Sequence, residues 1–177
     1  MQIILNLDKP LTFCILRSIL KMMGCFEQFD DFKSEEFKKI FTEYYLGEGI
    51  TLTEDTKVFD EIENSSKKYG TKCIVYKNVD KIAGFILFRI VKLRDEKKFF
   101  KYNFGYIEEL YVTENERNKH VATKLIEQCE NYLRQNKIKT IVLTADEKVY
   151  DFYIRKGFEE DDIISCENKL KCFKKKL

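Results

Sequence analysis

The chain has 177 residues, of which 44% are hydrophobic, including 15 phenylalanines and 10 tyrosines, and this is ample apolar material for one globular core. Charged residues make up 35% of the chain but nearly cancel to a net charge of +2, so wholesale nucleic-acid binding is not indicated. We therefore expect a single domain over residues 1–177 that does not act on nucleic acid.

Neither a membrane segment nor a metal centre is expected from the sequence. No apolar run approaches the roughly 18 residues that span a bilayer, and Asp8, Lys9 and Pro10 interrupt the front of the chain before a signal-peptide core could form. The expectation is a cytoplasmic protein without a membrane partner. The six cysteines lack close-paired spacing and His120 is the single histidine, which favours free, buried thiols over a disulfide framework or a metal site.

Residues 1–70 predict one strand followed by three helices. Residues 2–7 are β-prone, and a helix is expected over residues 8–24. Ser34 is the predicted N-cap of a second helix. Thr51 and Glu54 have the spacing of a capping box, which predicts a third helix that ends near residue 70.

A hairpin and a third strand are predicted next. Residues 72–77 and 81–91 read as strands joined by a turn at residues 78–80, and residues 93–103 form either a charged loop or an extension of the strand. Residues 106–112 read as a further strand with Glu108 and Glu109 at its middle. Simple alternation would send these two side chains to opposite faces, whereas a local bulge would break that alternation.

The polar residues that follow this strand precede an amphipathic helix that starts at His120. Because the first turn of a helix leaves backbone N–H groups unpaired, Arg117 and Lys119 at that end indicate a bound anion. The alternative for this turn is an ordinary solvated loop. Asn136 is expected to close the helix in a left-handed conformation, and residues 140–144 predict the next strand. Strand, helix and strand form a crossover unit.

The last part of the chain predicts a short helix over residues 147–156, with Gly157 as its left-handed cap. In residues 169–176, lysines alternate with apolar residues, which favours a final edge strand protected by charge.

Two of these segments carry a resemblance to a known family. Residues 117–122, Arg-Asn-Lys-His-Val-Ala, resemble the acetyl-CoA pyrophosphate loop of the GNAT superfamily of N-acetyltransferases, with His120 where a first glycine is usual. Residues 152–158, Phe-Tyr-Ile-Arg-Lys-Gly-Phe, resemble that family's Phe-Tyr-x-x-x-Gly-Phe signature. The resemblance covers residues 72–175 as the cofactor-binding core. It implies an α/β fold with a mixed, mostly antiparallel central sheet of six to seven strands, flanked by about four to five helices.

The resemblance also implies roles for individual residues. Tyr153 would stand near the cofactor's sulfur as general acid, and its alternative is a buried tyrosine packed between helix and sheet. Glu108 would be the general base, with Glu109 as second choice, unless the two carboxylates merely face lysines of a neighbouring strand. The cofactor-binding residues would be Leu110, Tyr111, Val112, Arg117, Asn118, Lys119, His120, Val121, Ala122, Thr123 and Tyr153.

The function that follows from the resemblance is acetyl-CoA-dependent transfer of an acetyl group to a primary amine of a small molecule or peptide. The alternative is a non-catalytic acyl-CoA-binding or regulatory domain on the same scaffold. Residues 1–70 would supply the acceptor side, where an acidic and aromatic wall would suit a cationic amine. Residues 163–173 could also pair two copies into a homodimer. The wall would contain Phe26, Glu27, Phe29, Asp30, Asp31, Phe32, Glu43, Tyr44, Tyr45 and Glu48.

Overall fold

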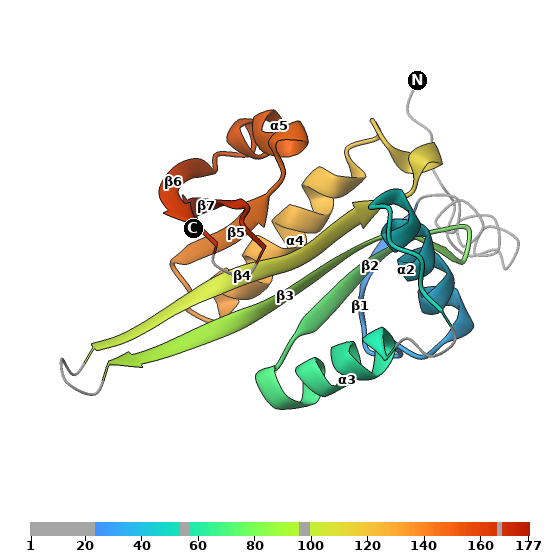
Figure 1. Cartoon of the computed structure of the whole chain (residues 1–177), viewed down its shortest axis with the longest axis horizontal. Coiled ribbons are helices and arrows are strands. Elements are labelled where there is room, and N and C mark those ends of the chain that lie inside the picture. The colour runs from blue at the N-terminus through green and yellow to red at the C-terminus, as the bar shows by residue number, and fades with distance from the viewer. Residues whose placement is uncertain (1–23, 54–56, 96–99, 166–167) are drawn as a thin grey trace, which may run out of the picture.

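The computed structural model describes residues 24–53, 57–95, 100–165 and 168–177 (Figure 1). The strand predicted over residues 2–7 and the helix after it lie outside the described residues. The strands are β1 Cys25–Phe29, β2 Lys72–Asn78, β3 Lys81–Asp95, β4 Phe100–Val112, β5 Thr140–Ala145, β6 Glu159–Ile164 and β7 Lys171–Lys176. The α-helices are α2 Glu35–Gly47, α3 Val58–Tyr69, α4 Val121–Gln135 and α5 Tyr150–Arg155, and two 3-10 turns are η1 Glu114–Glu116 and η2 Glu147–Val149.

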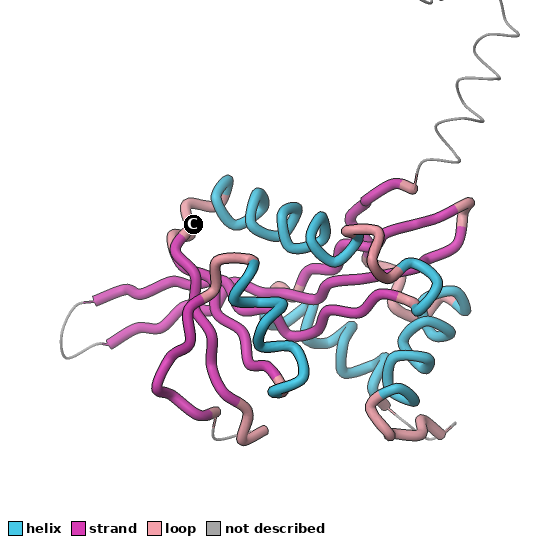
Figure 2. The backbone as a smooth tube through the Cα atoms, turned by 90° about the horizontal axis from the view of Figure 1, so that it is seen from above, coloured by secondary structure: helices cyan, strands magenta, loops and turns pink. Residues whose placement is uncertain are grey.

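The strands form one seven-stranded sheet in the order β1-β2-β3-β4-β5-β7-β6. Neighbouring strands are antiparallel except for β4 and β5, which run parallel. Helix α4 covers one face of the sheet, and α2 and α3 cover the other (Figure 2). This arrangement confirms the predicted mixed, mostly antiparallel sheet with helices on its faces.

Alternation along β3 explains why the sheet carries a core on each face. Phe85 and Leu87 pack against α2 and α3, whereas Ile86 and Phe88 pack against α4. All four side chains are at most 2% exposed. Strand β3 is therefore buried on both faces, and β4 is hydrogen-bonded directly to it.

Strands β4 and β5 stay together over a short stretch only. The two pairs between them are Gly105 with Ile141 and Tyr106 with Val142. A Cβ atom at Gly105 would lie 2.4 Å from the Cδ1 atom of Leu133, so the glycine lets α4 approach β4 closely at this junction. Beyond the junction the two strands are no longer paired, which opens the sheet between them.

Several local predictions are confirmed. Ser34 caps α2 by accepting a hydrogen bond from the N–H of Phe37 at 3.3 Å. Val79 and Asp80 form the hairpin turn with φ values of 48° and 64°, as a turn that requires positive φ at both central residues demands. Residues 93–103 extend the two strands where they are described, and Gly157 is left-handed with φ 81°.

Two helix boundaries were predicted wrongly. Helix α3 begins at Val58 with Lys57 at the N-cap position, and not at Thr51, because Leu52 packs against the core from the preceding loop. The left-handed residue after α4 is Lys137, with φ 60°, and not Asn136, whose side-chain amide instead donates to the carbonyl of Tyr132 at 2.8 Å.

The prediction of a final edge strand was also wrong, because β7 lies inside the sheet between β5 and β6. Its lysines are used for pairing with acidic partners. Lys174 lies 3.0 Å from Asp161 of β6, and Lys175 lies 2.6 Å from Glu130 of α4. Opposite charges on β6 and α4 therefore account for the basic tail better than protection of a free edge does.

Candidate active site

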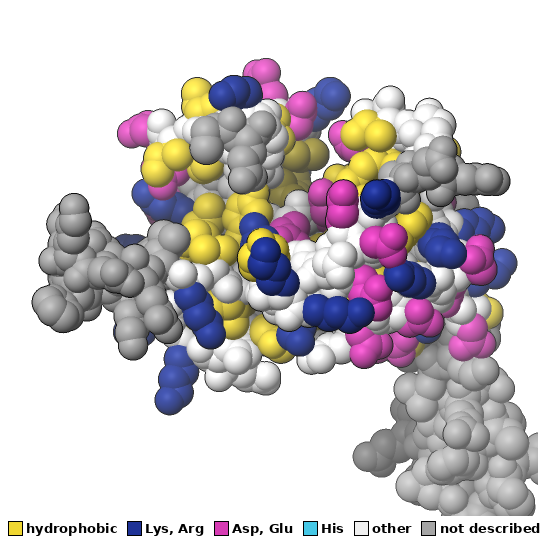
Figure 3. Space-filling view, turned by 60° about the horizontal axis from the view of Figure 1, so that its bottom comes forward, with side chains coloured by type: hydrophobic (Ala, Val, Ile, Leu, Met, Phe, Trp, Pro, Cys, Tyr) yellow, Lys and Arg dark blue, Asp and Glu magenta, His cyan; other side chains and the backbone are white. Residues whose placement is uncertain are grey.

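Three cavities follow one another where β4 and β5 separate. The loop cavity, about 470 Å³, lies beside residues 117–123; the strand cavity, about 570 Å³, lies beside Leu110–Val112; the carboxylate cavity, about 500 Å³, contains Glu108 and Glu109. Neighbouring cavities share lining residues such as Val149, so together they form one continuous cleft. In Figure 3 the surface is hollowed between two lobes, with acidic side chains at the rim.

The loop cavity has the backbone geometry of an anion site. Asn118 and His120 are left-handed, with φ values of 62° and 61°, and α4 starts directly after them. The N–H groups of Val121, Ala122 and Thr123 therefore stand in the first helical turn, where no intrahelical acceptor is available. His120 itself adopts the left-handed conformation that glycine adopts most easily, so the loop takes this path with a histidine at that position.

The basic residues of this loop are not equivalent. Arg117 lines the loop and strand cavities, donates from Nε to the carbonyl of Val112 at 3.2 Å, and lies 6.0 Å from the ring centroid of Tyr111. Lys119 instead contacts Glu116 at 3.2 Å, a residue 7% exposed that also accepts from Asn78. Of residues 117–123, Lys119 alone does not line the loop cavity.

Two further cations line the loop cavity and were missed in the sequence. They are Arg155 and Lys156, from the end of α5 and the residue after it. Both occupy variable positions of the Phe-Tyr-x-x-x-Gly-Phe segment, so only their positive charge could have drawn attention to them. With Arg117 they give the cavity a cationic border.

The middle of the cleft is formed by two elements. Leu110, Tyr111 and Val112 of β4 line one side, and Phe152 and Tyr153 of α5 line the other. These β4 residues pair with β3 along one edge, while their pairing with β5 has already ended at Tyr106. Their second backbone edge is therefore placed to hydrogen-bond an extended ligand as an added strand would.

A β-bulge brings both glutamates to the cleft. Leu87 of β3 pairs with Glu109 and Phe88 pairs with Ile107, so Glu108 is the extra residue of the bulge. Both glutamates line the carboxylate cavity and also a smaller cavity of about 230 Å³ beneath α2 and α3. The simple alternation that would separate the two side chains is broken at this point.

Glu108 has a cationic partner. Its carboxylate lies 3.1 Å from Nε of Arg89, on the neighbouring strand β3. The guanidinium of Arg89 is itself placed near the rings of Tyr69 and Tyr106, at 5.6 Å and 5.8 Å from their centroids. Burial raises the pKa of Glu108, and Arg89 opposes that rise. The alternative of a carboxylate that faces a cation of the next strand therefore describes Glu108, with arginine in place of lysine.

Glu109 is placed differently, although it is the adjacent residue. Burial raises the pKa of its carboxyl group to about 7, the hydrogen bond from Tyr44 lowers it, and the charges of Glu108 and Glu48 raise it further. The Tyr44 hydroxyl donates to Oε2 of Glu109. Among the described residues no cation forms an ion pair with Glu109. Its carboxyl group is thus poised to gain or lose a proton near neutral pH.

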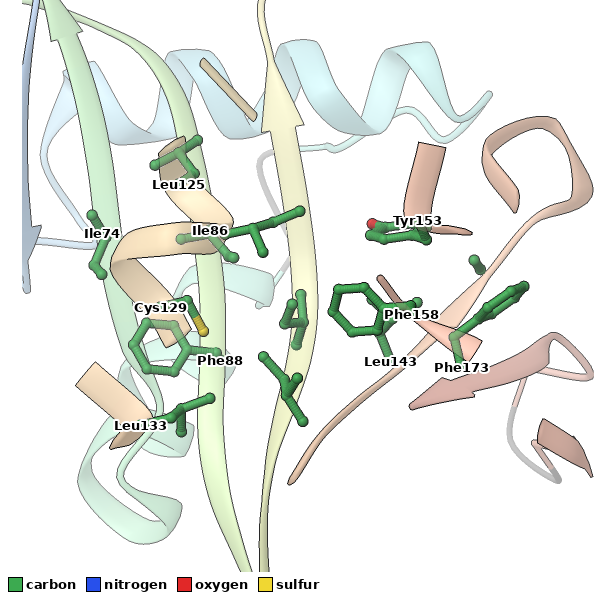
Figure 4. Packing of buried hydrophobic residues seen from close by; sticks show 14 of the residues in the cluster. Ile74, Ile86, Phe88, Leu125, Cys129, Leu133, Leu143, Tyr153, Phe158 and Phe173 are labelled. Atoms are coloured by element: carbon green, nitrogen blue, oxygen red, sulfur yellow. The ribbon is translucent and has the colours of Figure 1, made fainter. Parts of the chain in front are cut away.

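Tyr153 stands between the strand cavity and the carboxylate cavity and lines both. It is 9% exposed, and its ring contacts Phe152, Phe158 and Phe173, with its hydroxyl oriented toward β4 (Figure 4). Burial, together with the nearby charge of Glu109, raises the pKa of Tyr153 to about 12. The hydroxyl therefore keeps its proton at neutral pH and can donate it.

The expected acceptor wall is formed only in part. Tyr44 and Tyr45 of α2 line the carboxylate cavity, as does Glu48, the residue after the helix. Phe29 and Phe32 instead pack into the core beneath α2, and Phe26 packs against Tyr76 by the other core. The aromatic residues around β1 were wrongly placed in the wall because their spacing does not separate a core from a cavity lining. Of the remaining acidic residues, Glu27 pairs with Lys77 and Glu43 accepts from Tyr111.

Two other expectations concern the whole described structure. No cluster of three or more metal-ligating side chains occurs within the described ranges. In that same part of the chain, no helix has both the length and the apolar character to cross a membrane. The thiol of Cys129 is buried, as is that of Cys73, whereas Cys25 is exposed and Cys172 is half-buried.

Comparison with known proteins adds the family. No curated protein matches the sequence. Among solved structures, the fold is similar to a GNAT-family acetyltransferase from Staphylococcus aureus Mu50, with 19% identity and a TM-score of 0.65 over 87% of this chain and 99% of the other. A predicted acetyltransferase from Clostridium acetobutylicum, solved with acetyl-CoA, has 18% identity and a TM-score of 0.66 over 79% and 92% of the two chains.

Glucosamine-6-phosphate N-acetyltransferase from Arabidopsis thaliana is 20% identical, with a TM-score of 0.61 over 81% of this chain and 97% of that one. At these identities the likeness shows a shared fold. The model of the acetyltransferase (GNAT) family matches residues 34–158, which include α2, the bulged strand β4, the loop and α5. The chain belongs to the acetyltransferase (GNAT) family.

Proposed function

We propose that the protein is an N-acetyltransferase that moves an acetyl group directly from acetyl-CoA to a primary amine. The observation that carries the proposal is the continuous cleft between β4 and β5. It joins an anion-binding loop at one end to Glu109 and Tyr153 at the other. A cofactor with a phosphorylated end and a reactive thioester end needs a site of that order.

The residues of the cleft fit acetyl-CoA as a substrate. The amides of Val121, Ala122 and Thr123 and the cations Arg117 and Arg155 suit the phosphates. The free edge of Leu110–Val112 suits the amide-containing pantetheine arm. Acetyl-CoA is also the ligand named for the similar Clostridium structure.

The chemistry needs a neutral amine, a polarised carbonyl and a proton for the leaving thiolate. In our proposal Glu109 accepts a proton from the ammonium group, so that the nitrogen lone pair can attack the thioester carbonyl. The carbon–sulfur bond then breaks, and the Tyr153 hydroxyl gives its proton to the sulfur. The nitrogen loses its second proton as the amide forms, and this proton restores the Tyr153 hydroxyl. The proton on Glu109 passes to water before the next turnover.

Glu109 is preferred over Glu108 as the base, although Glu108 was the first choice from the sequence. A base must be able to hold a proton at the working pH. Arg89 stabilises the ionised form of Glu108 by a contact of 3.1 Å, whereas the pKa of Glu109 is raised to about 7. In this proposal Glu108 stays paired with Arg89 beside the reacting amine.

The acceptor that best suits the carboxylate cavity is an amine with additional positive charge, on a small molecule or a peptide. Besides the two glutamates, Glu48 and Asp146 line this cavity, and Lys148 is the basic residue in its lining. The rings of Tyr44 and Tyr45 add faces that attract cations. Rates measured with amines that carry either a second ammonium or a carboxylate would test this preference, and faster transfer to the anionic series would contradict it.

The non-catalytic alternative predicts binding without turnover. The catalytic proposal is supported by two groups in adjoining cavities, the Glu109 carboxyl group, whose pKa lies near neutral pH, and the protonated Tyr153 hydroxyl. Binding alone needs neither group.

Calorimetric titration with acetyl-CoA tests the cofactor part. We expect one site per chain, and Arg117→Ala should weaken binding by about tenfold or more, as is typical when a charged hydrogen bond is lost. The comparison variant is Lys119→Ala, which removes the same charge from a residue that contacts Glu116. An equal effect of both substitutions would mean that Arg117 has no special place, and no binding at millimolar acetyl-CoA would refute the proposed function.

A further inference from the structure

Helix α2 contributes a hydroxyl group to the proposed base. The Tyr44 hydroxyl donates to Oε2 of Glu109, although the two residues are 65 positions apart in the sequence. Tyr44 also lines the strand and carboxylate cavities, so this contact lies within the cleft. None of the sequence motifs includes Tyr44.

We propose that Tyr44 is a positioning residue, which fixes the carboxylate of Glu109 through Oε2 and stabilises its ionised form. The second oxygen, Oε1, is then the one that receives the proton from the acceptor amine. This inference rests on the proposed function of Glu109 as general base. It makes α2, which lies outside the cofactor-binding core, a working part of the site.

The ring of Tyr44 is held from several sides, which gives the hydroxyl a defined place. Its centroid lies 5.8 Å from that of Phe41 on the same helix, 5.8 Å from that of Phe85 on β3 and 5.5 Å from that of Tyr111 on β4. Phe41 and Phe85 are at most 1% exposed. A hydroxyl carried by such a ring can orient a partner with little loss of side-chain freedom.

The hydrogen bond also opposes the effect of burial. Burial disfavours the charged carboxylate of Glu109, as do the charges of Glu108 and Glu48, whereas the bond from Tyr44 favours it. A hydrogen bond to the ionised form is stronger than one to the neutral form, so its loss makes the group a weaker acid. The other ionisable groups that line the two cavities around this carboxylate are Glu48, Glu61, Glu108, Asp146, Lys148, Tyr45 and Tyr153. Arg89 pairs with the adjacent Glu108.

The test follows the titration of Glu109 directly. Glutamate labelled with ¹³C at Cδ is incorporated into the full chain, and the Glu109 signal is assigned by its disappearance in Glu109→Gln. We expect the midpoint of the wild-type protein near pH 7 and a rise of about one pH unit or more in Tyr44→Phe. The matched control is Tyr45→Phe, in the adjacent residue of the same cavity, which should move the midpoint by less than a third of that amount.

Tyr44→Phe retains the ring and its contacts, and circular dichroism monitors its fold. Tyr44→Leu serves as a second variant that also lacks the hydroxyl and should raise the midpoint in the same direction. An unchanged midpoint in a folded variant would overturn the inference. The activity assay separates this failure from that of the proposed function. If Glu109→Gln abolishes transfer and Tyr44→Phe leaves both the midpoint and the pH–rate profile unchanged, only the role of Tyr44 is lost.

Discussion

At the scale of single residues, two adjacent glutamates have become chemically different. Glu108 is balanced by the charge of Arg89, whereas Glu109 receives a hydrogen bond from the neutral Tyr44. The sequence predicted both residues for the site but ranked Glu108 first. It could not separate them, because the partners that decide the matter come from β3 and α2 and meet the carboxylates only after folding.

The raised pKa of Glu109 predicts the acid side of the pH–rate profile. The base works only when ionised, so kcat/KM should fall as pH decreases through about 7. Glu109→Gln should lower kcat roughly 10²- to 10⁴-fold. Steady-state rates between pH 5.5 and 9 measure both effects. If kcat/KM of the wild-type protein does not fall as pH decreases within this range, Glu109 is excluded as the base.

The same group predicts a pH-dependent cost in stability. A carboxyl group whose folded pKa lies above its usual value binds more protons when folded, so stability decreases as pH rises from about 4.5 through about 7. Glu109→Gln should therefore increase the free energy of unfolding at pH 8, by roughly 1–3 kcal/mol, and have little effect at pH 5. Urea denaturation at the two pH values measures the difference.

Glu108→Gln is the comparison for that measurement. It removes the same charge but leaves Arg89 without the carboxylate that lies 3.1 Å away. Burial also raises the pKa of Glu108, so we expect a gain in stability at pH 8 that is smaller than that of Glu109→Gln, because the lost contact with Arg89 offsets it. Equal stabilisation by both substitutions would show that simple repulsion between the two glutamates, and not the burial of Glu109, determines the effect.

At the scale of the elements, the site depends on where β4 and β5 stop pairing. Their common stretch at Gly105 and Tyr106 is packed against α4, and the cleft starts immediately beyond it. The sequence predicted the strand, the helix and the next strand with small errors, because β-branched and periodic apolar residues mark them. No sequence pattern marks how far β4 and β5 stay paired, because the length of that pairing depends on how closely α4 can approach β4.

Gly105→Ala tests that close approach. The added methyl group would meet the side chain of Leu133, which is fully buried, so we expect a loss of about 1–3 kcal/mol in unfolding free energy. The matched control is Gly47→Ala at the end of α2, where an added Cβ meets no atom within 4 Å. That substitution should be neutral or slightly stabilising. Similar losses in both variants would contradict the proposed packing constraint.

At the scale of the whole molecule, the cleft is assembled from parts of the chain that are distant in sequence. Helix α2 supplies Tyr44, β4 supplies the carboxylates, and α5 supplies Tyr153. The family resemblance correctly predicted the fold, because its motifs lie within one continuous segment, and the cofactor side of the cleft stays a prediction. It could not predict that β7 enters the sheet between β5 and β6, or which residues of α2 face the cleft. A cytoplasmic location and a homodimer stay predictions.

The most direct test of the central claim is the release of free CoA thiol from acetyl-CoA when a pool of primary amines, including diamines, is added to the protein. We expect thiol release that depends on the amine and saturates with its concentration. Tyr153→Phe should release thiol at least tenfold more slowly and still bind acetyl-CoA. A wild-type protein that binds acetyl-CoA but releases no thiol with any amine in the pool would contradict the proposed acetyl transfer.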